Sequence, residues 1–155
     1  MSLYQQFAGV EAGRLGATIK GSLWLFPAIE SVHLLALSVL GGALLMLDLR
    51  LLGAGLTLQP VSAVEKSARP WLLAALATMI VSGVLIAVSE AIKLYDKGAF
   101  WVKMTALAGA LLFTFAVKNP LARRDISGIG ARALGATSIL LWLTVAIAGR
   151  WIGFS

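Results

Sequence analysis

Four long apolar stretches, separated by short polar segments, dominate this 155-residue chain. They cover residues 23–47, 71–88, 100–117 and 134–152. A helix rises about 1.5 Å per residue, so about 20 residues are enough to cross roughly 30 Å of hydrocarbon. The pattern therefore predicts an all-α fold in which four transmembrane helices form a bundle.

The segment before the first stretch has a different pattern. Residues 1–22 combine apolar positions such as Phe7 and Val10 with polar ones such as Glu11, at close to helical spacing. This spacing favours a short amphipathic helix that lies in the membrane interface. We expect the chain to divide into this interfacial helix and a bundle formed by residues 23–155.

Two prolines set the expected ends of the middle spans. Pro70 is expected to start the second span, with Trp71 as its interfacial anchor, because proline is well tolerated in the first turn of a helix. Pro120 disfavours helical geometry in the residue before it, so the third span should end by Asn119. Residues 118–132 should then form a basic loop.

Composition supports the membrane interpretation. Hydrophobic residues make up 59% of the chain and charged residues 13%, and the mean hydropathy is +0.91, which excludes a water-soluble domain. The net charge of +6 comes from basic residues beside helix ends, where they contact membrane lipids rather than nucleic acid. The absence of cysteine excludes disulfides and thiolate metal sites.

The distribution of Lys and Arg suggests an orientation. Five of these residues lie near span ends on the side of both termini, and seven lie on the opposite side. The seven are Arg50, Lys66, Arg69, Lys118, Arg123, Arg124 and Arg132. The positive-inside rule then predicts a multi-pass protein of the bacterial cytoplasmic membrane with both termini in the periplasm.

Candidate chemistry lies in ionisable side chains within the apolar stretches, because charges are expensive in lipid. Glu30 and His33 are three residues apart and share one helical face. Up-and-down connectivity places Lys103 of the third span in the same half of the membrane. We therefore predict an intramembrane polar cluster of Glu30, His33 and Lys103. Thr114 lies on the same face of the third span as Lys103, and we expect this face to point inward.

Three further charged residues are secondary candidates. Asp48 lies 18 residues after Glu30, which is five helical turns, and together with Arg50 it should close the first span at the interface. There Asp48 could cap the helix or pair with a basic residue of the next loop, and Arg50 could reach lipid headgroups. Glu90, near the end of the second span, should be solvated.

The segment WLFPAIESVHLLAL, which contains Glu30 and His33, is followed by Gly41-Gly and then by LDLRLLG. Together with FWVKM at Lys103 and the later Asn119-Pro, these motifs resemble an uncharacterised family of small four-helix bacterial membrane proteins. More distantly, they are similar to the copper-resistance-D-like membrane domain and to the four-helix membrane protoporphyrinogen oxidase. The similarity to the oxidase implies a haem or porphyrin site at His33 and Lys103.

Three functions remain open at this stage. The first is a structural or accessory membrane subunit without enzymatic activity, self-associated or part of a larger complex. In it, Glu30 could pair with Lys103, and His33 could donate to a backbone carbonyl or to Ser82 or Ser138 on another helix. The second is a haem b protein with His33 as axial ligand to the iron. Its second ligand would come from a partner's His33, from Lys103, or from no residue. The third is a proton or small-solute pathway through Glu30, His33 and Lys103.

Overall fold

The computed structural model describes residues 3–152, and helices joined by short turns make up nearly all of this part of the chain. Four long helical units are α3 (Leu25–Leu52), α4 (Val61–Ser89), the continuous run of α6 (Gly98–Leu112), η1 (Phe113–Lys118) and α7 (Asn119–Ala122), and α8 (Gly128–Ile152). Each of the four is long and apolar enough to cross a membrane. The predicted all-α bundle with four spans is therefore confirmed.

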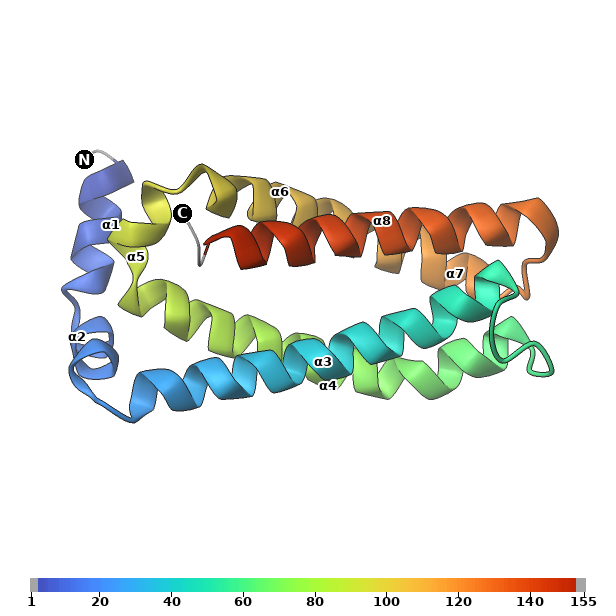
Figure 1. Cartoon of the computed structure of the whole chain (residues 1–155), viewed down its shortest axis with the longest axis horizontal. Helices are drawn as coiled ribbons and strands as arrows, with labels where there is room; N and C mark the ends of the chain where they lie inside the picture. Colours follow the sequence, from blue (N-terminus) through green and yellow to red (C-terminus); the bar gives the residue numbers. More distant parts are fainter. Residues whose placement is uncertain (1–2, 153–155) are drawn as a thin grey trace.

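The four long units form two layers (Figure 1). α3 runs beside α4 in one layer, α6 runs beside α8 in the other, and α3 also contacts α8. The α3–α4 turn and the α7–α8 turn lie together at one end, which we call the loop end. α1, α2 and α5 lie at the opposite end, which we call the N-terminal end.

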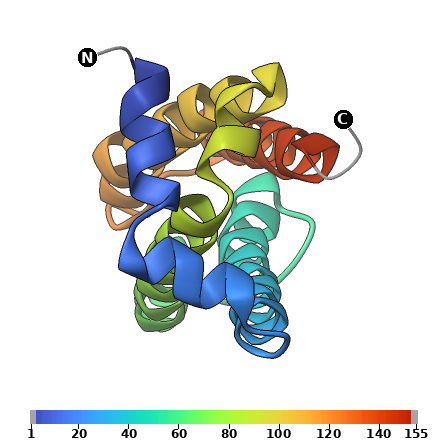
Figure 2. The ribbon, with the colours of Figure 1, turned by 90° about the vertical axis from the view of Figure 1, so that its left-hand side faces the viewer.

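The N-terminal segment folds as two short helices instead of the single one expected. α1 (Leu3–Glu11) and α2 (Arg14–Gly21) are separated by a break at residues 12–13 and lie across the ends of the long helices (Figure 2). α5 (Ala91–Tyr95) joins α4 to α6 and packs against α1. The interfacial position of this segment stays a prediction.

The predicted start of the second span at Pro70 is wrong. α4 begins at Val61, directly after Pro60, and Pro70 lies inside the helix. The Asp125 carboxylate accepts hydrogen bonds from the Ser62 backbone N–H at 2.8 Å and from the Ser62 hydroxyl at 2.9 Å. A carboxylate from a distant loop thus binds one of the N–H groups that a helix start leaves unpaired.

The predicted end of the third span is also wrong, because the helix continues through Pro120 to Ala122. Residues 113–118 form a π-helix, and the Asn119 N–H bonds to the Thr114 carbonyl five residues earlier. A π turn holds one more residue than an α turn, and the helix continues through the proline in this widened form. The basic loop is therefore confined to residues 123–127.

The buried apolar core extends along α3. One cluster, at the middle of the molecule, joins Leu40 and Leu44 of α3 to Leu72 of α4. A second cluster, at the loop end, joins Leu47 of α3 to Val64 of α4 and to residues of α7 and α8. The loop end is therefore the part of the bundle where all four long units meet.

Candidate functional site

A closed ring of three polar side chains lies inside the bundle near the loop end. The Lys118 Nζ donates to Asp48 Oδ1 at 2.8 Å and to the Ser138 Oγ at 2.7 Å, and Ser138 Oγ donates to Asp48 Oδ2 at 2.8 Å. Lys118 and Ser138 are 0% exposed and Asp48 is 1% exposed. This buried triad of Asp48, Lys118 and Ser138 joins α3, η1 and α8.

Helix geometry explains how Lys118 reaches the interior. Ala110, Thr114, Lys118 and Ala122 are each 0% exposed and are spaced by four residues. In a regular α-helix, a four-residue step overshoots a full turn by about 40°, so such a stripe would drift around the helix. The wider π turn absorbs the surplus residue and keeps all four side chains on the inward face.

Two further features fix the site. A Cβ atom at Gly135 would lie only 2.9 Å from the Asp48 carbonyl oxygen, so glycine allows α8 to cross closely over α3 at Asp48. This crossing brings Ser138, one turn later, to the carboxylate. The Trp142 indole N–H donates to the Thr114 hydroxyl at 3.1 Å and so ties α8 to η1 on the other side.

The predicted cluster of Glu30, His33 and Lys103 lies toward the N-terminal end, and its members are in looser contact. Glu30 and Lys103 are near enough to act electrostatically on the His33 imidazole. Glu30 is exposed and Lys103 is half-buried beside Gly149. Within residues 3–152, no hydrogen bond or ion pair joins the three side chains, so the expected Glu30–Lys103 pair is absent.

His33 makes one of the hydrogen bonds considered from the sequence, the one to Ser82. Its Nδ1 lies 2.8 Å from the Ser82 hydroxyl, which donates its single proton to the Thr78 carbonyl at 2.6 Å. With the Ser82 hydroxyl donating to Thr78, Ser82 accepts from His33 and Nδ1 carries the proton. In the neutral imidazole, Nε2 consequently keeps its lone pair.

One secondary candidate, Asp48, has a different environment from that expected. Asp48 does not end the helix at the interface, because it is buried and pairs with Lys118 of the third span, not with the next loop. α3 ends at Leu52, and Gly53 follows as its C-cap with a φ of +76°, a left-handed conformation that suits glycine. The Arg50 Nε donates to the Gln59 carbonyl at 2.5 Å, and Glu90 forms an ion pair with Lys93 at 3.3 Å.

Sequence reasoning missed Lys118, which it placed in a loop. The signal that could have identified Lys118 is the apolar stretch directly before it. A lysine that continues such a stretch can lie within the membrane, where it can neutralise Asp48. Its burial also leaves six basic residues at the loop end instead of seven, against five at the other, so the predicted orientation has weaker support.

Glu65 was missed for a similar reason, because its position was assigned to a connection. It is 4% exposed in α4. Its Oε1 accepts two hydrogen bonds at 3.0 Å from Arg123, one from Nε and one from Nη2. This pair holds α4 against the α7–α8 turn.

Fold and site together define a four-helix membrane protein with a neutralised ion pair in its interior. The model of a protein family of unknown function, DUF6644, matches residues 7–155, and the chain belongs to this family. No curated protein and no solved structure matches this chain. The family agrees with the uncharacterised membrane family inferred from the sequence motifs and brings no activity with it.

Proposed function

We propose that this protein is a structural or accessory membrane subunit whose intramembrane polar groups hold its helices in one arrangement. The observation that supports this proposal is the closed buried triad. Both carboxylate oxygens of Asp48 are occupied, and the Lys118 charge is neutralised at the same place. A ring of this kind joins the three helices through their polar groups.

Polar contacts between helices also recur outside the triad. The Trp142–Thr114 and His33–Ser82 bonds each join two different spans. The hydrocarbon of a membrane offers these polar side chains no water to bind, so hydrogen bonds to a neighbouring helix satisfy them. Three polar contacts within the spans, the triad and these two hydrogen bonds, thus join different helices, which is the pattern expected of a structural role.

The experiment compares stability with transport in the same preparations. The wild type, Asp48→Asn and His33→Ala are reconstituted in liposomes with a pH-sensitive dye, and their thermal unfolding is measured in detergent. We expect a lower unfolding temperature for Asp48→Asn and no proton flux above that of protein-free liposomes for any of the three proteins. Wild-type flux that is lost in Asp48→Asn or in His33→Ala would instead establish a proton pathway.

Haem b binding is the second candidate, and the open Nε2 of His33 favours it. The Ser82–Thr78 relay fixes the imidazole in the tautomer that an axial ligand needs, as outer hydrogen bonds do for metal-bound histidines. Bound haem would supply one-electron redox chemistry. His33 fits one ligand position, and the chain has no other histidine.

Absorption spectroscopy tests this candidate. The wild type, His33→Ala and Ser82→Ala are purified from haem-replete cells and measured oxidised and then dithionite-reduced. We expect a Soret band that shifts on reduction in the wild type and disappears in His33→Ala. In Ser82→Ala, which keeps the ligand but loses its orienting partner, the band should persist with lower haem occupancy. A colourless wild type would exclude haem binding by this chain under those conditions.

A further inference from the structure

A pocket at the loop end combines positive charge with an apolar wall. Its volume is about 290 Å³, and it lies where α3 ends and α8 begins. Its polar lining comes from Arg50, Arg132, Ser127 and Asp125, and its apolar lining includes Leu51. Because it lies at the ends of two spans, it is at the height of the lipid headgroups if these helices cross a bilayer.

The charges in the pocket are unequally compensated. Asp125 uses both carboxylate oxygens to bind Ser62 at the start of α4. The hydrogen bond from the Ser62 backbone N–H, and to a smaller extent that from its hydroxyl, holds the pKa of Asp125 below its usual value. Arg50 is close enough to act on Asp125, and its Nε is fixed by Gln59. Arg132 makes no hydrogen bond or ion pair within residues 3–152, so its positive charge is uncompensated there.

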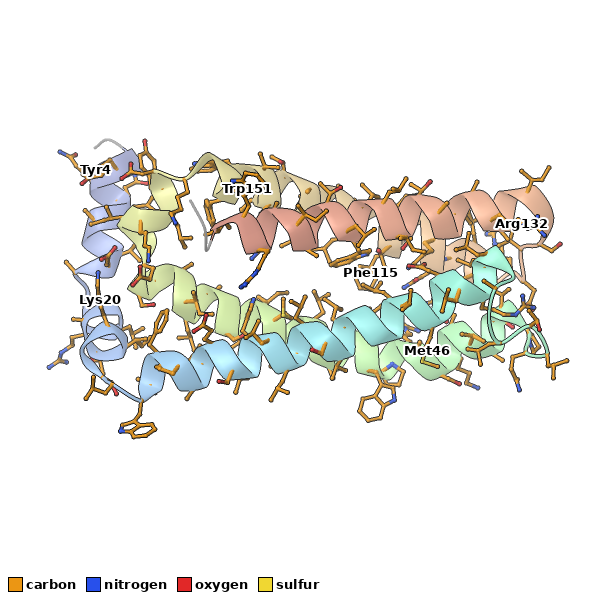
Figure 3. The ribbon with its side chains drawn as sticks, viewed as in Figure 1. Tyr4, Lys20, Met46, Phe115, Arg132 and Trp151 are labelled. Carbon is orange, nitrogen blue, oxygen red and sulfur yellow. The ribbon has the colours of Figure 1, made fainter. Side chains whose placement is uncertain are left out.

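Arg132 is exposed in the second turn of α8, at the end of the molecule opposite Tyr4 and Lys20 (Figure 3). The preceding turn of α8 contains no acidic residue, and Gly128, with a φ of +71°, begins it at the pocket. The positive end of the α8 helix dipole and two arginine residues therefore line the same pocket.

We propose that this pocket binds the phosphate headgroup of an anionic phospholipid. The two arginines would hold the phosphate, and the apolar wall formed by Leu51 and its neighbours would contact the glycerol and upper acyl carbons. Bound lipid would link the end of α3 to the start of α8. The same phosphate chemistry could be supplied by free phosphate ions, and the experiment separates the two sources.

Native mass spectrometry of the full chain in detergent provides the test. The probes are dioleoylphosphatidylglycerol, the zwitterionic dioleoylphosphatidylcholine and inorganic phosphate, each titrated against the wild type and Arg132→Gln. Arg124→Gln is the matched control, because Arg124 is exposed in the adjoining α7–α8 turn but does not line the pocket. Arg50→Gln is a second variant, and circular dichroism checks that each variant is folded.

We expect Arg132→Gln and Arg50→Gln each to weaken phosphatidylglycerol binding about tenfold, which corresponds to about 1.4 kcal/mol. Arg124→Gln should change it less than twofold, and phosphatidylcholine should bind more weakly to the wild type. An equal loss of phosphatidylglycerol binding in Arg124→Gln would show that the lipid is held by diffuse attraction to surface charge and not by the pocket. Displacement of phosphatidylglycerol by inorganic phosphate at equal concentration would overturn the lipid assignment in favour of a soluble anion, and unchanged binding in Arg132→Gln would overturn the site itself.

Discussion

Single residues decide how this chain tolerates charge inside a membrane protein. Asp48 and Lys118 are 70 positions apart in sequence, yet their side chains meet at 2.8 Å with Ser138 completing the ring. A buried ion pair adds little net stability compared with apolar residues, whereas removal of one partner leaves a buried charge without compensation. The two residues should therefore depend strongly on each other.

A double-mutant cycle on this pair makes the dependence measurable. Lys118→Met and Asp48→Asn should each destabilise the fold by about 3–5 kcal/mol, which lowers the unfolding temperature by on the order of 10 °C. The double variant should lose much less than the sum of the two, because neither charge remains. Thermal unfolding in detergent measures all four proteins.

Arg69→Gln is the matched control for the cycle, because this exposed cation of α4 makes no ion pair within residues 3–152. Its unfolding temperature should stay close to that of the wild type. Additive losses in the double variant would show that Asp48 and Lys118 contribute independently, contrary to the geometry of the ring.

The sequence could indicate that charges in the spans need partners, but only partly which ones. Ser82 was among the partners considered for His33, because a hydroxyl in a neighbouring span is a natural acceptor. Lys118 was not considered for Asp48, because Pro120 argued for a loop at that place. Local steric rules describe a regular α-helix, whereas this helix continues as a π-helix that such rules do not represent.

At the scale of the element, η1 acts as a one-residue insertion in an otherwise regular span. The buried stripe from Ala110 to Ala122 has spacings of four, four and four residues. A regular α-helix keeps a stripe on one face with spacings of four, three and four. The third span therefore contains one residue too many for an α-helix, and the π turn holds it.

Deletion of Ala116, an exposed residue within η1, should consequently be tolerated. It would restore the four-three-four spacing and convert η1 to α-helix with Lys118 still facing inward. We expect folded protein with an unfolding temperature within a few degrees of the wild type, measured by circular dichroism and size-exclusion chromatography.

Deletion of Leu140 is the matched control, because this exposed residue lies in the regular helix α8. It would turn Val145 and Ala148 by about 100° relative to Ser138 and move them away from the core. We expect this variant to be aggregated or far less stable. An equal loss of stability in both deletion variants would show that η1 does not hold a surplus residue.

At the scale of the whole molecule, hydropathy alone predicted four spans, since solvent preference can be read residue by residue. Helix ends were predicted less well, and the start of α4 depends on contacts from elsewhere in the chain. Asp125 binds this start, and Arg123 pairs with Glu65 near the same end. Such long-range contacts leave no periodic signal in the sequence.

The N-terminal end is held by one carboxylate that joins three short helices. Glu11 of α1 accepts hydrogen bonds from Lys20 of α2 at 2.5 Å and from the Ile92 N–H of α5 at 2.8 Å. The Lys20 hydrogen bond, and after it that of Ile92, lower the pKa of Glu11 below its ordinary value. A lowered carboxyl pKa means that this stabilisation is complete above the ordinary pKa of glutamate and is lost as the pH falls through the lower pKa of the folded state.

Hydrogen exchange of the Ile92 amide should therefore reveal a pH-dependent contact. At pH 7, Glu11→Gln should exchange this amide about tenfold faster than the wild type, which is near the lower limit for the loss of a hydrogen bond to a charged group. The difference should be smaller at pH 3, where a larger fraction of Glu11 is protonated and resembles glutamine. Asp96→Asn, which changes a carboxylate at the same end that has no hydrogen bond or ion pair within residues 3–152, should match the wild type at both pH values. A difference between wild type and Glu11→Gln that is as large at pH 3 as at pH 7 would mean that the carboxylate charge does not hold α1, α2 and α5 together.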